Sequence, residues 1–249
     1  MTTSQKAAVS AALIALGSLM PAAAQTDPSI PVGTLDAYPT FVQTGTHPTL
    51  TWDIDYPSTV IDVIDILDPP VVVPTEDLYM DVRIVGTGVT RAYYDRRGRL
   101  SRTESVRAQC WTQVNNYSWN LLFDGKINDV NPDEVVYTRL VREGDRINFG
   151  ARYLKSNGYW STFYYTAWDS GNVVALVDGD LVPNNIPDWG APSLESFLEP
   201  YMNQDNTVNV GPMDVFYVME LTHTNPNDSG YDLQDMIVLV TFRTVTSNN

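Results

Sequence analysis

Apolar side chains occupy every second position along several short runs of this chain, and this alternation limits its fold more than any other feature. It is clearest at residues 50–57, 78–86, 117–123 and 213–221, where one face of each run is apolar. A strand that buries one face has this period of two, whereas an amphipathic helix has a period near 3.6. The pattern therefore predicts strands.

Turn residues separate the alternating runs. Asn157-Gly158 and Asp178-Gly179 are typical of type I′ hairpin turns, in which both central residues take a positive φ, and Asp124-Gly125 marks another turn. Short strands at this spacing predict an all-β fold, an antiparallel β-sandwich of immunoglobulin-like or jelly-roll-like type.

Two segments interrupt the alternation. Residues 60–68 repeat two apolar residues and an aspartate, which fits either a short helix capped by Ser58 and stopped by Pro69-Pro70, or a buried strand. Residues 193–202 predict one short helix or turn with Ser193 as its cap.

The first 24 residues have the features of an export signal. Lys6 is followed by an apolar stretch at residues 7–20 and by small residues at 22–24. This order predicts a signal peptide at residues 1–24 and a secreted protein, periplasmic or extracellular. No later stretch approaches the roughly 20 apolar residues of a membrane-spanning helix, so we expect no transmembrane segment in the mature chain.

About 225 residues remain, enough for one large or two small domains. We place the main β-sandwich domain at residues 91–249. Residues 25–90 form either an N-terminal β segment that adds strands to it or a small immunoglobulin-like subdomain.

Charge and cysteine content restrict the possible partners. The formal net charge is −15, and 23 of the 30 acidic residues are aspartate, which argues against a nucleic-acid partner. This acidity fits a salt-rich environment or divalent cations, or serves solubility alone. Cys110 is the single cysteine, so no intrachain disulfide forms, and we expect its thiol to be a small buried apolar group rather than a reactive one.

The last two strand-like runs, residues 213–224 and 231–242, form a predicted closing hairpin. Antiparallel pairing brings the end of the first run next to the start of the second. Four acids lie there: Glu220, Asp228, Asp232 and Asp235. They either supply oxygen ligands to a Ca²⁺ ion, our candidate cofactor, or cap and solvate the hairpin end.

The sequence "MEL" followed by "YDLQDMIVLV" resembles the ending of a β-sandwich domain of unknown function in bacterial extracellular proteins, whose signature is "ED", a loop and "DxDYNDxVV". Glu220 matches the acid of "ED", while Asp232 and Asp235 match the two spaced acids. Leu233 replaces the aromatic residue and Gln234 the asparagine. The wider chain resembles uncharacterised exported bacterial proteins, and the resemblance implies an exported β-sandwich without a known activity.

A basic island covers residues 92–107. Its string "YDRRGRL" resembles one copy of the tyrosine–aspartate repeat of large bacterial shell-forming proteins, and it predicts a hairpin in which Gly98 takes a positive φ. Arg96, Arg97 and Arg99 are candidate contacts for an anionic glycan or for an acidic face of another copy of this chain. The alternative is a solvated hairpin whose arginines pair with the acidic majority.

Aromatic residues occupy both faces of residues 158–168, which predicts a strand covered on both sides or a face on which a sugar stacks. For a glycan platform, the candidates are Trp160, Tyr164 and Trp168.

Catalytic motifs are absent from the sequence. His47 and His223 are the only imidazoles, and no nucleophile elbow or zinc-binding histidine pair occurs, so we name no catalytic residue. We therefore expect a non-enzymatic structural, adhesive or binding protein of the bacterial cell surface or extracellular matrix, which calcium stabilises. The alternatives are a carbohydrate-binding module, a polysaccharide-acting enzyme, or a protein that self-associates through sheet edges.

Overall fold

The computed structural model describes residues 32–38, 49–55, 59–183, 192–228 and 230–245. The predicted signal peptide and its cleavage point lie outside the described residues, as do Ser58 and His47.

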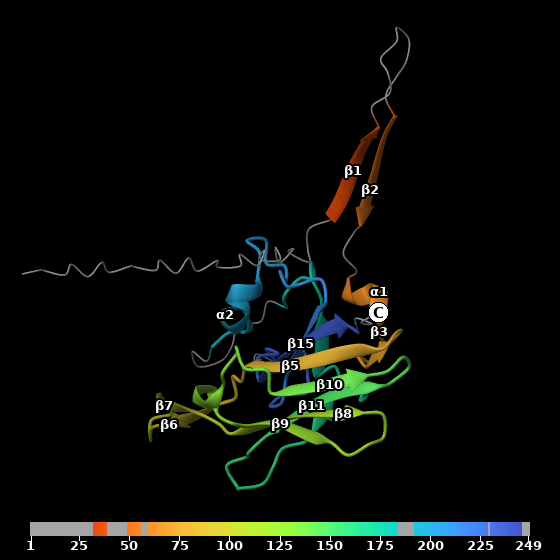
Figure 1. The fold of residues 1–249 in the computed structure, drawn as a ribbon. Helices are drawn as coiled ribbons and strands as arrows, with labels where there is room; N and C mark the ends of the chain where they lie inside the picture. The colour runs from red at the N-terminus through yellow and green to blue at the C-terminus, as the bar shows by residue number, and fades with distance from the viewer. Residues whose placement is uncertain (1–31, 39–48, 56–58, 184–191, 229, 246–249) are drawn as a thin grey trace, which may run out of the picture.

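Two antiparallel sheets form the body of the protein (Figure 1). The first has five strands in the order β10-β5-β15-β14-β13. Its strands are β5 (Leu78–Gly86), β10 (Tyr137–Val141), β13 (Val173–Leu176), β14 (Asp214–Met219) and β15 (Met236–Thr244). The second has six strands in the order β3-β4-β11-β8-β9, and β12 also pairs with β11. Its strands are β3 (Ile64–Ile66), β4 (Val72–Pro74), β8 (Ala108–Val114), β9 (Asn120–Gly125), β11 (Ile147–Tyr153) and β12 (Tyr164–Tyr165).

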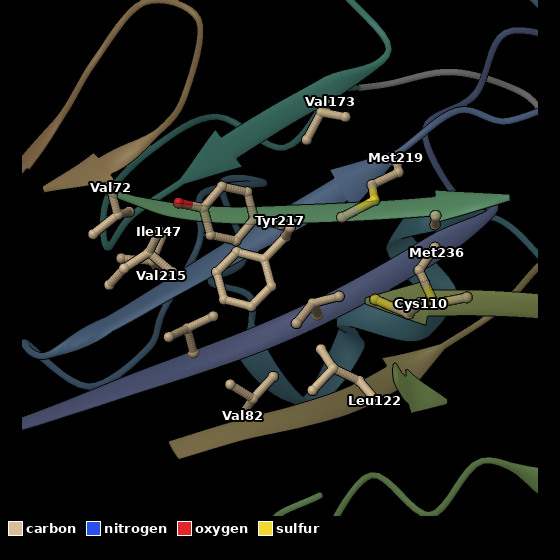
Figure 2. Packing of buried hydrophobic residues seen from close by; sticks show 14 of the residues in the cluster. Val72, Val82, Cys110, Leu122, Ile147, Val173, Val215, Tyr217, Met219 and Met236 are labelled. Carbon is tan, nitrogen blue, oxygen red and sulfur yellow. The ribbon is translucent and has the colours of Figure 1, made fainter. Parts of the chain in front are cut away.

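The main hydrophobic core lies between the two sheets, as the β-sandwich prediction requires. Phe149 of β11 and Tyr217 of β14 meet across it with ring centroids 4.8 Å apart, and both residues are fully buried. Figure 2 shows Tyr217 and Met219 among the side chains that fill this layer, with Cys110 and Met236 close by. The finer assignment to an immunoglobulin-like or jelly-roll-like type stays a prediction.

A second hydrophobic cluster covers the other face of the five-stranded sheet. Helix α2 (Leu194–Leu198) places Leu194 and Leu198 against Phe216 and Leu239 of the two central strands. Strands β14 and β15 are therefore buried on both faces. This explains why residues 236–242 are almost continuously apolar rather than alternating, since a strand covered on both sides needs no polar face.

The remaining elements are short. Two hairpins form two-stranded sheets of their own, β1 (Val32–Tyr38) with β2 (Thr49–Asp55), and β6 (Thr90–Tyr94) with β7 (Leu100–Ser105). The short helices are α1 (Val60–Val63), η1 (Ile127–Asp129) and η3 (Glu199–Tyr201). Within the described residues no helix is long and apolar enough to cross a membrane.

The strands between residues 64 and 86 belong to the two large sheets. β3 and β4 lie at the edge of the six-stranded sheet, while β5 pairs with β15 and β10. A domain boundary at residue 90 would therefore separate β5 from both of its partner strands. Strands β1 and β2, which also lie within residues 25–90, pair only with each other among the described strands, and the division of the chain into domains stays a prediction.

Residues 60–68 combine the two conformations that their sequence allows. They form helix α1 and then strand β3. Thr59 is the N-cap residue of the helix, and its backbone N–H and hydroxyl both donate to the Asp62 carboxylate at 2.8 Å. In α2, Ser193 caps the helix as predicted, because its hydroxyl oxygen accepts from the Ser196 N–H.

The predicted turns are correct in part. Gly98 takes a positive φ of 74° between β6 and β7, as expected. Gly158 and Gly179 also have positive φ, but the residues before them do not, so the type I′ prediction is wrong. At residues 155–159 the glycine instead follows an ordinary turn and closes the hairpin in the left-handed conformation. Asp124-Gly125 ends strand β9 rather than forming a turn.

The inter-sheet ring contact gives a stability prediction. Phe149→Ala should lower the free energy of unfolding by about 3–5 kcal/mol, because it removes a fully buried ring and leaves a cavity. Tyr217→Phe should leave it unchanged or raise it by about 1 kcal/mol, because the buried Tyr217 hydroxyl has no hydrogen-bond partner within the described residues. Denaturant unfolding measures both, and a large loss in Tyr217→Phe would contradict the packing described here.

Candidate functional site

Three of the four predicted metal ligands come together at one end of the five-stranded sheet. Glu220 follows β14, and Asp232 and Asp235 lie in the loop before β15. These residues are 0%, 4% and 3% exposed. Asp228 is exposed and accepts a hydrogen bond from Asn225, so the structure leaves it outside the group. We call Glu220, Asp232 and Asp235 the carboxyl cluster.

The cluster depends on a buried loop where the sequence predicts a strand. β15 begins at Met236, and residues 231–235 instead form a loop in which Leu233 has a φ of 57°. The Gly88 N–H donates to the Gln234 carbonyl at 2.9 Å. A Cβ at position 88 would lie 2.8 Å from that oxygen, so glycine is required for this close approach. The loop thus turns two acids inward.

Backbone donors surround the Glu220 carboxylate. Its Oε1 accepts from the N–H groups of Thr222 and His223, each at 2.8 Å, and from the Thr222 hydroxyl at 2.7 Å. Its Oε2 accepts from the Asp232 N–H at 3.0 Å. Several hydrogen bonds to a carboxylate compensate for the water that burial removes from it.

The two aspartates hold protons more strongly than usual. Burial, followed by the charge of Glu220, raises the pKa of Asp232 to about 7 and raises the pKa of Asp235 well above its ordinary value. The Leu221 N–H donates to the Asp235 carboxylate at 2.7 Å, and the Gln234 side chain donates to Asp232 at 2.8 Å. Asp232 is therefore partly protonated near neutral pH, and the ionisation of Asp235 is opposed by the same causes.

Two polar side chains flank the cluster. The buried Asn172 amide donates to the carbonyls of Glu220 and His223 at 2.9 and 2.6 Å. The His223 Nδ1 lies 3.6 Å from the Glu220 carboxylate, with the ring packed on Gly230, where a Cβ would clash with it. Across the described ranges, no set of three or more His, Cys, Asp or Glu side chains is arranged to hold a metal ion. Calcium stays a prediction for this cluster.

The predicted glycan platform of Trp160, Tyr164 and Trp168 does not form. Tyr164 is only 6% exposed and belongs to the inter-sheet core, with Trp168 stacked on it at a centroid distance of 5.2 Å. Trp160 is covered by the guanidinium of Arg152, which lies 4.8 Å from the ring centroid. The aromatic residues at 158–168 predicted one continuous strand. Most of this segment is irregular instead, and within it only Tyr164–Tyr165 form a strand.

A different set of aromatic side chains forms an open hollow on the outer face of the six-stranded sheet. We call it the aromatic hollow. It has a volume of about 270 Å³ and is lined by Trp111, Trp119, Arg152 and Phe163. All four residues are half-buried.

Strand register explains how the hollow forms. Trp111 of β8 pairs with Gly150 of β11, and the missing side chain at position 150 leaves space above the sheet. Phe163 and Tyr165 occupy this space, because a Cβ at position 150 would lie 2.7 Å from an atom of each. Trp119 then packs edge-on against Phe163, with centroids 4.9 Å apart.

A row of polar side chains borders the hollow. The Arg152 Nε donates to the Gln109 side chain at 2.9 Å, and the Gln109 amide donates to Asp124 at 2.9 Å. Arg107 binds the same Asp124 carboxylate through two of its nitrogens, which lowers the pKa of Asp124. The row therefore carries two guanidinium groups and one carboxylate.

The basic island identified in the sequence forms most of the β6–β7 hairpin. Asp95 pairs with Arg99 at 3.0 Å and accepts from the Arg97 and Arg99 N–H groups, so it shapes the turn. The Arg96 and Arg97 side chains are exposed and form no hydrogen bond or ion pair within the described residues. A contact with an anionic partner through Arg96, Arg97 and Arg99 stays a prediction.

Sequence inspection could have found part of the hollow. Trp111 and Arg152 face outward from β8 and β11. The residues directly before them, Cys110 and Ala151, are buried on the opposite face. The meeting of Phe163 with Trp119 has no sequence signal, because it depends on the path of an irregular segment. The buried Cys110 follows its prediction, and burial raises the pKa of its thiol to about 12.

Comparison of the chain with protein-family models, curated proteins and solved structures finds no match. The resemblance of the closing hairpin to the bacterial extracellular domain therefore stays a prediction.

The carboxyl cluster predicts an unusual dependence of stability on pH. Because the pKa values of Asp232 and Asp235 are raised by folding, the folded state holds protons that the unfolded state releases above about pH 4. Their contribution to stability is largest in acid and decreases as the pH rises through about 7. In EDTA, the melting temperature of the Asp232→Asn/Asp235→Asn variant should therefore decrease less than that of the wild type between about pH 5 and about pH 8.

Asp228→Asn is the matched control, since it removes a nearby carboxylate that is exposed. Its melting curve should follow the wild type at every pH. Parallel pH profiles for the wild type and the double variant would show that the buried aspartates do not retain protons.

Proposed function

We propose that this protein is an exported, non-enzymatic binding protein that attaches to a glycan at the bacterial cell surface or in the extracellular matrix. The aromatic hollow formed by Trp111, Trp119, Phe163 and Arg152 is the observation that carries this proposal. It replaces the platform predicted from the sequence.

The lining chemistry supports sugar binding. Indole and phenyl faces offer apolar area with little conformational entropy to lose, and Arg152 adds hydrogen-bond donors at the side. The volume of about 270 Å³ is slightly below the roughly 300–1,000 Å³ typical of small-molecule pockets, which suits one sugar ring better than a long polymer segment.

The same lining favours binding over hydrolysis. Glycoside hydrolysis requires two carboxyl groups on either side of the scissile bond. None of the four lining residues carries a carboxyl or imidazole group. The acids with strongly raised pKa values, Asp232 and Asp235, are buried in the carboxyl cluster and out of reach of a polymer substrate.

Trp119→Ala should abolish retention on a glycan array or weaken it by at least about tenfold, because it removes one aromatic wall of the hollow. Trp168→Ala is the matched control, since Trp168 is 42% exposed but does not line the hollow. We expect the control to bind like the wild type. Retention of no glycan by the wild type, or equal losses in the two variants, would refute glycan binding by the hollow.

We also propose that Ca²⁺ stabilises the closing segment through Glu220, Asp232 and Asp235, without Asp228. Three buried carboxyl groups repel one another once ionised, and a hard divalent cation with oxygen ligands would relieve this repulsion. The cation would displace the protons that the aspartates hold and would require small shifts of their side chains.

Addition of about 5 mM CaCl₂ should raise the melting temperature by about 2–4 °C for a site of millimolar affinity. Asp235→Asn should remove this increase, and Asp228→Asn should keep it. An unchanged melting temperature in the wild type, or an equal increase in both variants, would rule out calcium at the cluster.

A further inference from the structure

We propose that the aromatic hollow selects a glycan that carries carboxylate groups, such as a uronic acid polymer, and that Arg152 binds the carboxylate. This inference rests on the proposed function, because it names the ligand class of the same hollow.

Arg152 is held in place, but its outer nitrogens remain available. Its Nε donates to Gln109 at 2.9 Å, while the guanidinium lies 5.6 Å from the Trp111 ring centroid and 4.8 Å from that of Trp160. These contacts restrict the plane of the guanidinium. The two terminal nitrogens of Arg152 form no hydrogen bond with any part of the chain that the structure describes. A planar guanidinium with free terminal N–H groups matches a carboxylate in geometry and charge.

Within the described residues no carboxylate forms a hydrogen bond or ion pair with Arg152, although its charge helps to lower the pKa of Asp124. Asp124 is the acid nearest in the polar row, and both of its oxygens are engaged by Arg107, with Gln109 as a further donor. The row of two guanidinium groups and one carboxylate therefore has a local excess of one positive charge. This excess is notable in a chain with a formal net charge of −15.

The position of the charge fits an acidic sugar better than an acidic small molecule without a ring. Trp111 and Arg152 both line the hollow, with Trp119 and Phe163 as further aromatic walls. A pyranose ring against the aromatic side chains can thus place a substituent at the guanidinium. A neutral sugar would fill the aromatic part of the hollow but leave the Arg152 charge without a partner.

The test compares matched ligands that differ only in charge. Oligogalacturonate, oligomannuronate and oligoguluronate are each titrated by calorimetry beside the same oligomer with its carboxyl groups reduced to alcohols. An ionic strength of about 0.15 M limits the repulsion by the acidic protein to a range of about 8 Å. The wild type should bind at least one acidic oligomer roughly 10–100-fold more tightly than its reduced form, the range expected for a charged hydrogen-bonded pair.

Arg152→Gln should remove this preference and retain binding of the reduced oligomer within about twofold, because the aromatic walls remain. Arg152→Lys keeps the charge but not the planar fork, so an intermediate preference is expected. Arg97→Gln is the matched control: it removes the same charge from the exposed β6–β7 hairpin and should keep the full preference. Melting temperatures verify that each variant is folded. If Arg152→Gln does not fold, the comparison of Arg152→Lys with the wild type is the test.

The outcomes separate the two proposals. Equal binding of acidic and reduced oligomers by the wild type would overturn acid selection and leave glycan binding in place. A preference lost in Arg97→Gln but kept in Arg152→Gln would place the contact on the hairpin and overturn the role of Arg152. Binding of no glycan at all would overturn the proposed function, and this inference with it.

Discussion

The structure depends on the burial of strands β14 and β15 on both faces. The six-stranded sheet covers one face through contacts such as Phe149 against Tyr217, and α2 with its neighbouring loops covers the other. Any backbone or side chain that enters or leaves this central pair is desolvated, so its polar groups need partners within the protein. The polar groups at the ends of these strands therefore form hydrogen bonds within the protein rather than with water.

The carboxyl cluster is the consequence of this constraint at one end. Glu220 continues directly from β14 into the buried layer, and the loop at residues 231–235 returns two more acids to the same place. Backbone N–H groups satisfy Glu220, whereas burial and the charge of Glu220 oppose the ionisation of the two aspartates and raise their pKa values. A divalent cation could replace the protons of such aspartates, which is why we propose the calcium site at the same place as the pH-dependent pair Asp232 and Asp235.

The outer face of the six-stranded sheet, unlike the central strands, is not covered by a second layer of the described chain. It is open to solvent, and the chain covers part of it with the aromatic side chains of an irregular segment rather than with another sheet. Gly150 is decisive, because only a residue without a side chain lets Phe163 and Tyr165 approach the strand. The hollow and the polar row beside it are therefore surface features built on paired strands, and Arg152 is positioned there by its hydrogen bond to Gln109.

The closing hairpin shows how far sequence reasoning reaches and where it stops. The pairing of β14 with β15 and the convergence of Glu220, Asp232 and Asp235 follow from the order of the residues, because antiparallel neighbours share an end. Their depth of burial does not follow, since it requires the cover provided by distant segments around Gly88 and α2. Asp228 was grouped with them for its proximity in the chain, yet it lies in the exposed part of the loop.

Local chemistry was sufficient for the alternating strands, the left-handed Gly98, the cap at Ser193 and the buried thiol of Cys110. These features depend on a residue and its near neighbours, or on the two-residue period of a strand with one buried face. Tertiary structure alone decided that Tyr164 faces the core, that Trp111 and Trp119 share a hollow, and that Arg152 forms no ion pair with an acid of the described residues. Each of these depends on which non-local segments pack together, and the free energy of that packing is a property of the whole core rather than of any short stretch of sequence.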